Sequence, residues 1–185
     1  MVAIEELTES RSAEEWKGKG NLAFKAGNYE DSLEAYNKAI ESSREDGQLK
    51  STILFNRGTA LFHLSRFSES VESCTEAILL NSNYIKALYR RAKAHEKLEQ
   101  FTEAIHDFER MFELDTESRN QHNKEYRQLI RLRDEKFEKE KGELMTNLKD
   151  IGNKLLGNFG LSLDNFKLEK NETGNYSIQF NNDSS

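Results

Sequence analysis

The fold of this chain is decided by residues 85–111, which read IKALYRRAKAHEKLEQFTEAIHDFERM. In the first half, IKALYRRAKAHEK, apolar residues recur every three or four positions, as on one face of a helix. A second helical pattern begins at Phe101 after a short polar break. Ala92 and Ala104 are small where two neighbouring helices would approach each other. The stretch therefore predicts two helices that pack together and are joined by a tight turn.

Two earlier blocks of the chain, which begin at Ala13 and Ser51, repeat this pattern. Residues at matching positions share their character, because large, small and aromatic residues recur in the same order. The second and third blocks start about 34 residues apart. The first block carries four extra residues, which we place in the polar segment SREDGQ. Three copies of one helix–turn–helix unit are therefore expected.

These blocks resemble the tetratricopeptide repeat, a helix–turn–helix unit of about 34 residues. The resemblance implies an all-α fold, a right-handed superhelix of three repeats at residues 13–50, 51–84 and 85–116. The proline that usually follows the second helix of such a repeat is absent, because the chain has no proline. Residues 81–83 (NSN) are expected to end one helix and to cap the next. Cys74 is expected to be a buried, unreactive thiol at a core position.

The segments that flank the repeats have other patterns. Residues 1–12 are polar and acidic and are expected to form a flexible leader. Ser12 and Glu15 have the spacing of a capping box at the start of the first helix. Residues 117–157 are expected to form a capping and extended helix, because a stack of repeats needs an end with a polar outer face.

The tail at residues 158–185 contains two segments of alternating apolar residues around a turn at residues 171–174. This pattern is compatible with a small β-hairpin. Because an isolated hairpin is only marginally stable, it must dock on the helices, bind a partner or remain partly disordered. Residues 147–180 also resemble the C-terminal segment of a eukaryotic cytosolic chaperone adaptor with the same repeats. As part of an adaptor, the C-terminal region is expected to offer a surface for a second protein partner.

The composition limits the class of function. The chain has 27 basic and 33 acidic residues, a net charge of −6, which argues against nucleic-acid binding. A single cysteine and the lack of an apolar leader indicate a reducing, cytoplasmic location, and no apolar run is long enough to span a membrane. His95, His106 and His122 lack the spacing of metal ligands. We expect no metal, no cofactor and no enzymatic activity, since the sequence shows neither a phosphate-binding loop nor a paired nucleophile and base.

Positive charge is concentrated in the helix predicted at residues 85–97. Against the single acid Glu96, this helix carries five basic residues: Lys86, Arg90, Arg91, Lys93 and Lys97. Lys86 and Arg90 are four residues apart, so both side chains leave the same face of a helix. In an acidic chain, this local excess predicts one wall of a groove that holds a carboxylate.

In tetratricopeptide arrays the first helix of each repeat lines the concave face, and these helices are expected here at residues 13–26, 51–64 and 85–98. Their motifs WKGKGN, ILFNRG and IKALYR resemble the two-carboxylate clamp of chaperone-binding tetratricopeptide domains. All five clamp positions match in residue type and in register: Lys17, Asn21, Asn56, Lys86 and Arg90. In that family the clamp holds the free C-terminus of Hsp70 and Hsp90 chaperones, which ends Glu-Glu-Val-Asp. The resemblance therefore implies a co-chaperone adaptor.

The residue types suit this chemistry, because a C-terminal aspartate presents two carboxylates on one residue. Lysines supply charge, asparagine amides donate neutral hydrogen bonds, and Arg90 offers a bidentate fork. Phe24 and Phe62 are expected to face the same groove and to hold the valine and an upstream apolar residue of the peptide. His63 and Lys93 are expected to border the groove, and a plain surface role is at least as compatible with them.

An alternative function stays open. The chain would then be a general scaffold, for example for signalling proteins, whose groove takes an internal peptide. A chaperone-tail peptide with and without C-terminal amidation separates the two functions, because only a clamp for a chain end requires the terminal carboxylate. The sequence does not choose between Hsp70 and Hsp90.

Overall fold

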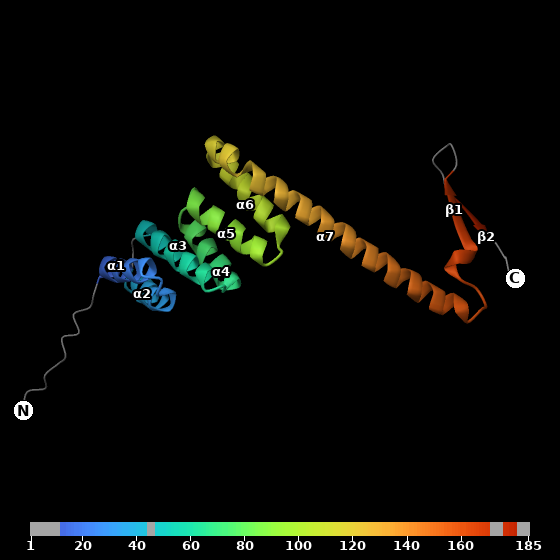
Figure 1. Cartoon of the computed structure of the whole chain (residues 1–185), viewed down its shortest axis with the longest axis horizontal. Helices are drawn as coiled ribbons and strands as arrows, with labels where there is room; N and C mark the ends of the chain where they lie inside the picture. The colour runs from blue at the N-terminus through green and yellow to red at the C-terminus, as the bar shows by residue number, and fades with distance from the viewer. Residues whose placement is uncertain (1–11, 44–46, 171–175, 181–185) are drawn as a thin grey trace, which may run out of the picture. The chain divides into compact units, whose positions relative to one another are not determined.

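The structure, a computed structural model, describes residues 12–43, 47–170 and 176–180 of the chain (Figure 1). The chain divides into two compact units, Met1–Arg133 and Asp134–Ser185, and each is described by itself. None of the described helices combines the length and the apolar character that a membrane crossing requires.

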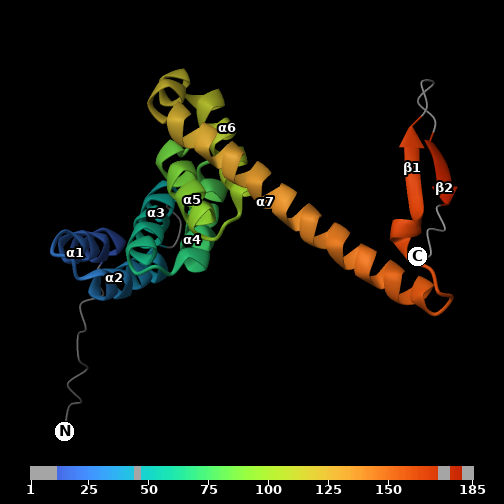
Figure 2. The same ribbon diagram turned by 45° about the vertical axis from the view of Figure 1, so that its right-hand side comes forward.

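The described part of the first unit contains three helix–turn–helix pairs (Figures 1 and 2). The helices are α1 (Ala13–Lys25), α2 (Tyr29–Ser42), α3 (Gly47–His63), α4 (Phe67–Leu80), α5 (Ile85–Lys97) and α6 (Phe101–Leu114). The first helices of the pairs are neighbours, since α1 contacts α3 and α3 contacts α5. Successive pairs also contact each other through α2 with α3 and through α4 with α5. The predicted stack of three repeats is therefore confirmed.

The first helix begins where the sequence predicted. The Ser12 backbone N–H donates to Oε2 of Glu15 (2.8 Å), and the Glu15 backbone N–H donates to Oγ of Ser12 (3.3 Å). These two bonds satisfy backbone donors that have no partner inside the helix. The rest of the leader expected at residues 1–12 lies outside the described residues.

The turn inside each repeat uses a residue with a left-handed backbone conformation. These residues are Gly27 (φ 81°), Ser65 (φ 60°) and Glu99 (φ 56°). Glycine adopts this conformation without the steric cost that serine and glutamate carry. The three repeats therefore share one turn geometry, although only the first has glycine at this position.

Two details of the connections between repeats differ from the expectation. The four residues before Ser51 extend α3 by one turn, so that α3 starts at Gly47 within the segment expected to form a loop. Leu49 in this added turn packs against the core of the first two repeats, which explains why the helix is longer. Asn81 ends α4, but α5 is capped by Tyr84, whose side chain makes no capping hydrogen bond.

Small residues allow the helices within a repeat to approach closely, as predicted. A Cβ atom added at Gly20 would lie 2.5 Å from Cε1 of Tyr36, and one added at Gly58 would lie 2.8 Å from Sγ of Cys74. Cys74 is fully buried, and burial raises the pKa of its thiol to about 12. The predicted inert thiol is therefore confirmed, because only the thiolate reacts as a nucleophile.

Replacement of Gly20 by alanine is expected to lower the free energy of unfolding by about 1–3 kcal/mol, since the new methyl group must displace the buried Tyr36 ring. Gly18 lies in the same helix, and a Cβ atom there would meet nothing within 4 Å. Gly18→Ala is therefore expected to raise this free energy by up to about 1 kcal/mol through helix propensity. Urea unfolding followed by circular dichroism measures both. Equal stability of the two variants would contradict the close packing of α1 on α2.

A long helix, α7 (Thr116–Gly157), follows α6, and its first part caps the third repeat. The Asp115 carboxylate accepts the backbone N–H groups of Glu117 and Ser118, both at 3.1 Å, at the start of α7. Leu129 is buried in a cluster that also holds Phe108. The capping helix that the sequence predicted is therefore present.

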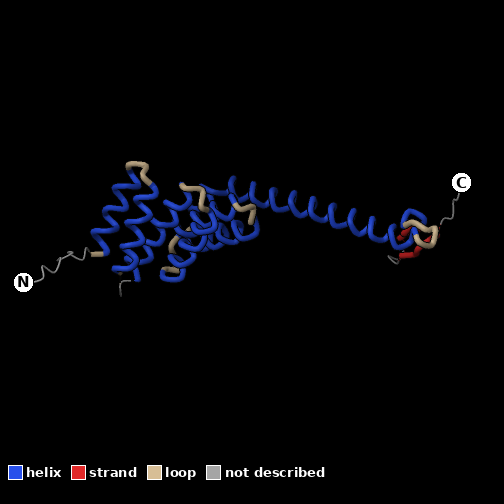
Figure 3. Tube along the Cα trace, turned by 90° about the horizontal axis from the view of Figure 1, so that it is seen from below, coloured by secondary structure: helices blue, strands red, loops and turns tan. Residues whose placement is uncertain are grey.

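The second unit holds the end of α7 and a hairpin, which Figure 3 shows as helix and strands. The elements after α7 are η1, a 3₁₀ turn (Leu163–Asn165), β1 (Phe166–Lys170) and β2 (Tyr176–Phe180). β1 and β2 pair in an antiparallel register with Phe166 opposite Phe180. The predicted hairpin is therefore present, while the turn expected at residues 171–174 lies outside the described residues.

Candidate functional site

Two asparagines from different repeats meet between α1 and α3. Nδ2 of Asn56 donates to Oδ1 of Asn21 (3.1 Å), and the hydroxyl of Tyr36 donates to the same oxygen (2.8 Å). Burial raises the pKa of Tyr36, which keeps the phenol protonated and therefore able to donate. Because the oxygen of Asn21 accepts both bonds, its amide nitrogen is left as the hydrogen-bond donor of this side chain.

A pocket of about 260 Å³ opens beside this pair of asparagines. Its walls combine apolar rings with a few polar groups, which is typical of ligand-binding pockets. The lining residues are Asn21, Phe24, Lys25, Tyr36, Phe55, Asn56 and Thr59. Phe24 thus lines the same pocket as two of the five proposed clamp residues.

Lys17 lies one helical turn before Asn21 on α1. Its ammonium group is 2.5 Å from the carboxylate of Glu14, and the Glu14 side chain is exposed. An exposed ion pair between neighbours on one helix is weak, about 0–1 kcal/mol, so a ligand carboxylate can compete for the lysine. Lys17 is not among the residues that line the pockets around Asn21 and Arg90.

Lys86 and Arg90 line a second pocket, of about 350 Å³, on α5. Lys86 is exposed, whereas Arg90 is half-buried, with its guanidinium 4.7 Å from the centre of the Phe62 ring. Burial lowers the pKa of Arg90, because a buried charge loses contact with water. Within the described part of the chain, Nε of Arg90 is buried and donates to no acceptor.

The two pockets share one wall, because Phe55 lines both of them. The structure therefore brings Asn21 and Asn56 into direct contact and places Lys86 and Arg90 in the adjoining pocket. Together they offer two amides and two cations, which is the set of donors that binds carboxylates. Among the described residues, His, Cys, Asp and Glu form no group that could hold a metal ion.

Two other residues that were expected at the groove make contacts of their own. Phe62 lies under Arg90 and packs edge to face against Phe67, with ring centres 5.3 Å apart. His63 stacks on Tyr29 at 4.7 Å. Burial and the nearby charge of Arg90 lower the pKa of His63, which favours its neutral form.

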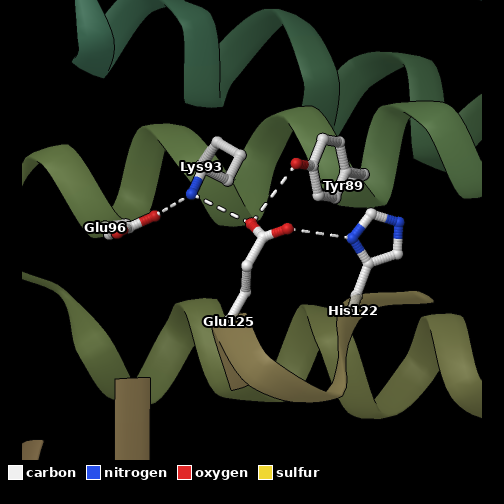
Figure 4. A network of polar contacts seen from close by, with 5 residues as sticks. All are labelled: Tyr89, Lys93, Glu96, His122 and Glu125. Atoms are coloured by element: carbon white, nitrogen blue, oxygen red, sulfur yellow. Dashed lines mark hydrogen bonds and ion pairs between the residues drawn. The ribbon is translucent and has the colours of Figure 1, made fainter. Parts of the chain in front are cut away.

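Lys93 belongs to a polar network that joins α5 to α7, which Figure 4 shows. Its ammonium group contacts Glu96 and lies 3.1 Å from Glu125. Glu125 also accepts a hydrogen bond from the Tyr89 hydroxyl (3.3 Å) and contacts His122 (3.1 Å). Burial acts to raise the pKa of Glu125, but the hydrogen bonds and charges of His122 and Lys93 together outweigh it and lower the pKa. The network holds α7 against α5 and neutralises much of the charge of Lys93.

The start of α7 adds site residues that sequence reasoning missed. The second pocket is lined by Phe55, Ile85, Lys86, Tyr89, Arg90, Met111, Ser118, Gln121 and His122. Three of these residues, Ser118, Gln121 and His122, come from α7. One sequence signal could have located them. Asp115 is of a residue type that caps helices, and its position directly after the third repeat marks the start of the helix that carries them.

Comparison with known proteins gives two matches to a protein family. The sequence profile of the tetratricopeptide repeat matches residues 13–46 and residues 85–118. The first match covers α1 and α2, and the second covers α5 and α6. These are the first and third helix–turn–helix pairs of the structure.

Solved structures of the same kind are similar to this chain. The first repeat domain of Spaghetti (RPAP3), bound to the HSP90 peptide SRMEEVD, is 32% identical with a TM-score of 0.58, and the match covers 66% of this chain and 93% of that one. The second repeat domain of human RPAP3, in complex with the HSP70 peptide SGPTIEEVD, is 33% identical with a TM-score of 0.57. That match covers 63% of this chain and 93% of the human domain.

Relatives known by sequence are longer than the matched region. The DnaJ homolog subfamily C member 7 homolog of Schizosaccharomyces pombe is 36% identical over 110 residues, which is 60% of this chain and 23% of that protein. The chain thus spans less than a quarter of the length of this relative.

Proposed function

We propose that this chain, which belongs to the tetratricopeptide repeat proteins, binds the C-terminal Glu-Glu-Val-Asp segment of Hsp90 or Hsp70. The repeats act as a binding module of a co-chaperone adaptor rather than as an enzyme. Lys17, Asn21, Asn56, Lys86 and Arg90 form the carboxylate clamp. This assignment is supported by two similar domains, which were solved with chaperone peptides that end in EEVD.

The observation that carries the proposal is that two pockets sharing Phe55 present the amides of the first two repeats and the cations of the third. Asn21 is held by Tyr36 and Asn56, so the donors of the first two repeats are oriented before a ligand arrives. Arg90 is half-buried, and its Nε has no acceptor in the described part of the chain. Pre-oriented donors favour binding because little side-chain entropy is lost when the ligand arrives.

A clamp of this kind distinguishes a chain end from an internal aspartate. The last residue of a Glu-Glu-Val-Asp peptide carries both a side-chain carboxylate and the terminal carboxylate. Three cationic and two amide groups can satisfy both carboxylates, whereas an internal aspartate leaves some of these donors without an acceptor. An unsatisfied donor in a partly buried site costs about 1–3 kcal/mol.

Calorimetric titration with one peptide in two forms tests the proposal. The peptide ends Met-Glu-Glu-Val-Asp and carries either a free or an amidated C-terminus. Amidation is expected to weaken binding at least tenfold, about 1.4 kcal/mol, because the terminal charge is lost. Peptides that end in the HSP90 and HSP70 sequences, run side by side, measure the preference between the two chaperones.

The control peptide keeps the same composition in a scrambled order with a free C-terminus. Equal affinity for the free and amidated peptides would favour the alternative of a general scaffold that takes internal segments. No binding of either peptide would contradict the proposed binding of a chaperone tail.

The C-terminal region supplies the second half of the adaptor in this proposal. The end of α7 and the hairpin present apolar side chains at their surface, among them Phe159, Ile178 and Phe180. Such groups are available to a second protein while the repeats hold the chaperone tail.

A further inference from the structure

The second unit has an exposed apolar row along α7 that the proposed function does not use. Every apolar residue of the row is between 52% and 63% exposed. The row, which we call the α7 seam, consists of Phe137, Lys141, Leu144, Leu148, Ile151 and Leu155. Large apolar side chains in one row on a soluble protein mark a contact surface.

The spacing of the seam is that of a coiled coil. Phe137, Leu144 and Ile151 follow one another at intervals of seven residues, and so do Lys141, Leu148 and Leu155. Taken together, neighbouring positions of the seam are alternately four and three residues apart, which is the spacing of a coiled coil. Lys141 takes the place of the missing apolar residue in the second series. A helix with this repeat buries its seam against another helix by inserting side chains between those of its neighbour.

The chain's own tail packs on α7 beside the seam. Cδ1 of Leu163 would lie 2.5 Å from a Cβ atom added at Gly152, and the Lys149 ammonium is 2.7 Å from Asp164. Oδ1 of Asn153 accepts the backbone N–H of Leu163 (2.6 Å). Gly152, Lys149 and Asn153 lie beside the seam on the helical wheel and not within it. Among the seam residues, Leu148 lines a pocket together with Leu163 and Asp164 of the tail, but its side chain is still 52% exposed, so the seam stays accessible to another molecule.

We propose that the α7 seam binds the α7 seam of a second copy of this chain in an antiparallel coiled coil. The seam is symmetric about its own centre, which is the condition for a two-fold contact between identical surfaces. Leu148 then meets Leu144 of the second copy, Leu155 meets Phe137 of the second copy, and the stem of Lys141 covers Ile151 of the second copy. A parallel pair would instead place Lys141 against Lys141, which like charges disfavour.

The charges beside the seam agree with the antiparallel order. Glu140 and Lys154 lie on the same flank, and each is one heptad from Asn147. In the antiparallel pair, Glu140 of each copy faces Lys154 of the other, and Asn147 lies near the two-fold axis. Glu140 and Lys154 are therefore complementary across the interface, which favours a second copy over an unrelated helix.

Sedimentation velocity of the full chain over a concentration series tests the association. A reversible dimer is expected, and Ile151→Glu is expected to lower its association constant at least tenfold, because the new carboxylate would be buried at the seam. The matched control is Leu79→Glu at the end of α4, where the leucine is 80% exposed and lies outside the seam. Its association is expected to equal that of the parent.

Two further experiments test the orientation and do not depend on the correct folding of the Ile151→Glu variant. Glu140→Lys is expected to weaken the dimer, and the double variant Glu140→Lys/Lys154→Glu is expected to restore it. Asn147→Cys is expected to give a disulfide-linked dimer under mild oxidation, whereas Lys139→Cys on the outer face of α7 is not. The buried Cys74 does not interfere, since burial raises the pKa of its thiol to about 12.

The proposal is overturned if the chain stays monomeric up to about 100 μM, even if the seam binds a different protein. It is also overturned if a dimer forms but Ile151→Glu leaves it intact, or if the charge reversal does not restore association. None of these measurements involves a chaperone peptide, so failure here is distinct from failure of the proposed function.

Discussion

Replacement of Arg90 by alanine is expected to lower the affinity for a Glu-Glu-Val-Asp peptide at least tenfold, about 1.4 kcal/mol. The guanidinium is half-buried over the Phe62 ring, and its Nε has no acceptor in the described part of the chain. A ligand carboxylate there gains a charge-assisted hydrogen bond with little competition from water. Isothermal titration calorimetry measures the change. Arg90→Lys is expected to be intermediate, because it keeps the charge but loses the bidentate fork.

Two lysines of α5 provide a matched comparison for this experiment. Lys86 lines the second pocket, whereas Lys97 is exposed at the other end of the helix. Lys86→Ala is expected to weaken binding at least tenfold, as for Arg90, and Lys97→Ala to leave it nearly unchanged. Circular dichroism checks that each variant stays helical. The clamp assignment would be wrong if Lys86→Ala and Arg90→Ala bound the peptide as tightly as the parent.

Replacement of Asp107 by alanine is expected to have the largest effect on stability, lowering the free energy of unfolding by about 3 kcal/mol. Asp107 is only 2% exposed, and it accepts hydrogen bonds from Nε (2.9 Å) and Nη2 (2.6 Å) of Arg91. Arg91 also donates to Oγ1 of Thr75 (3.0 Å), so one guanidinium joins α4, α5 and α6. Without Asp107, the largely buried charge of Arg91 loses its counter-ion.

Urea unfolding measures this change, and an exposed ion pair in the same helix provides the control. Arg110 and Glu113 are 2.9 Å apart, but both side chains are exposed. Glu113→Ala is therefore expected to cost only about 0–1 kcal/mol. If Asp107→Ala cost no more than Glu113→Ala, the pair between Arg91 and Asp107 would not be a structural link between the repeats.

The local contacts within one repeat were predictable because they depend on neighbours in the sequence. The capping box of Ser12 and Glu15 spans three residues, and the close approach at Gly20 follows from a pattern that occurs three times. The left-handed turns at Ser65 and Glu99 were not predictable from residue type, since neither residue favours that conformation. Their position is set by the packing of the two helices that they join.

The sequence by itself determined the three repeats, the long helix after them, the hairpin and the helix face on which each proposed clamp residue lies. Periodicity settles these features because it is a local property of the chain. Tertiary structure alone decided which groups meet: Asn56 holds Asn21, 35 residues away, and Lys93 is bound by Glu125, 32 residues away. It also decided that α7 supplies a wall of the second pocket. The physical reason is that a helical period fixes the direction of a side chain, whereas its partner depends on how separate helices pack.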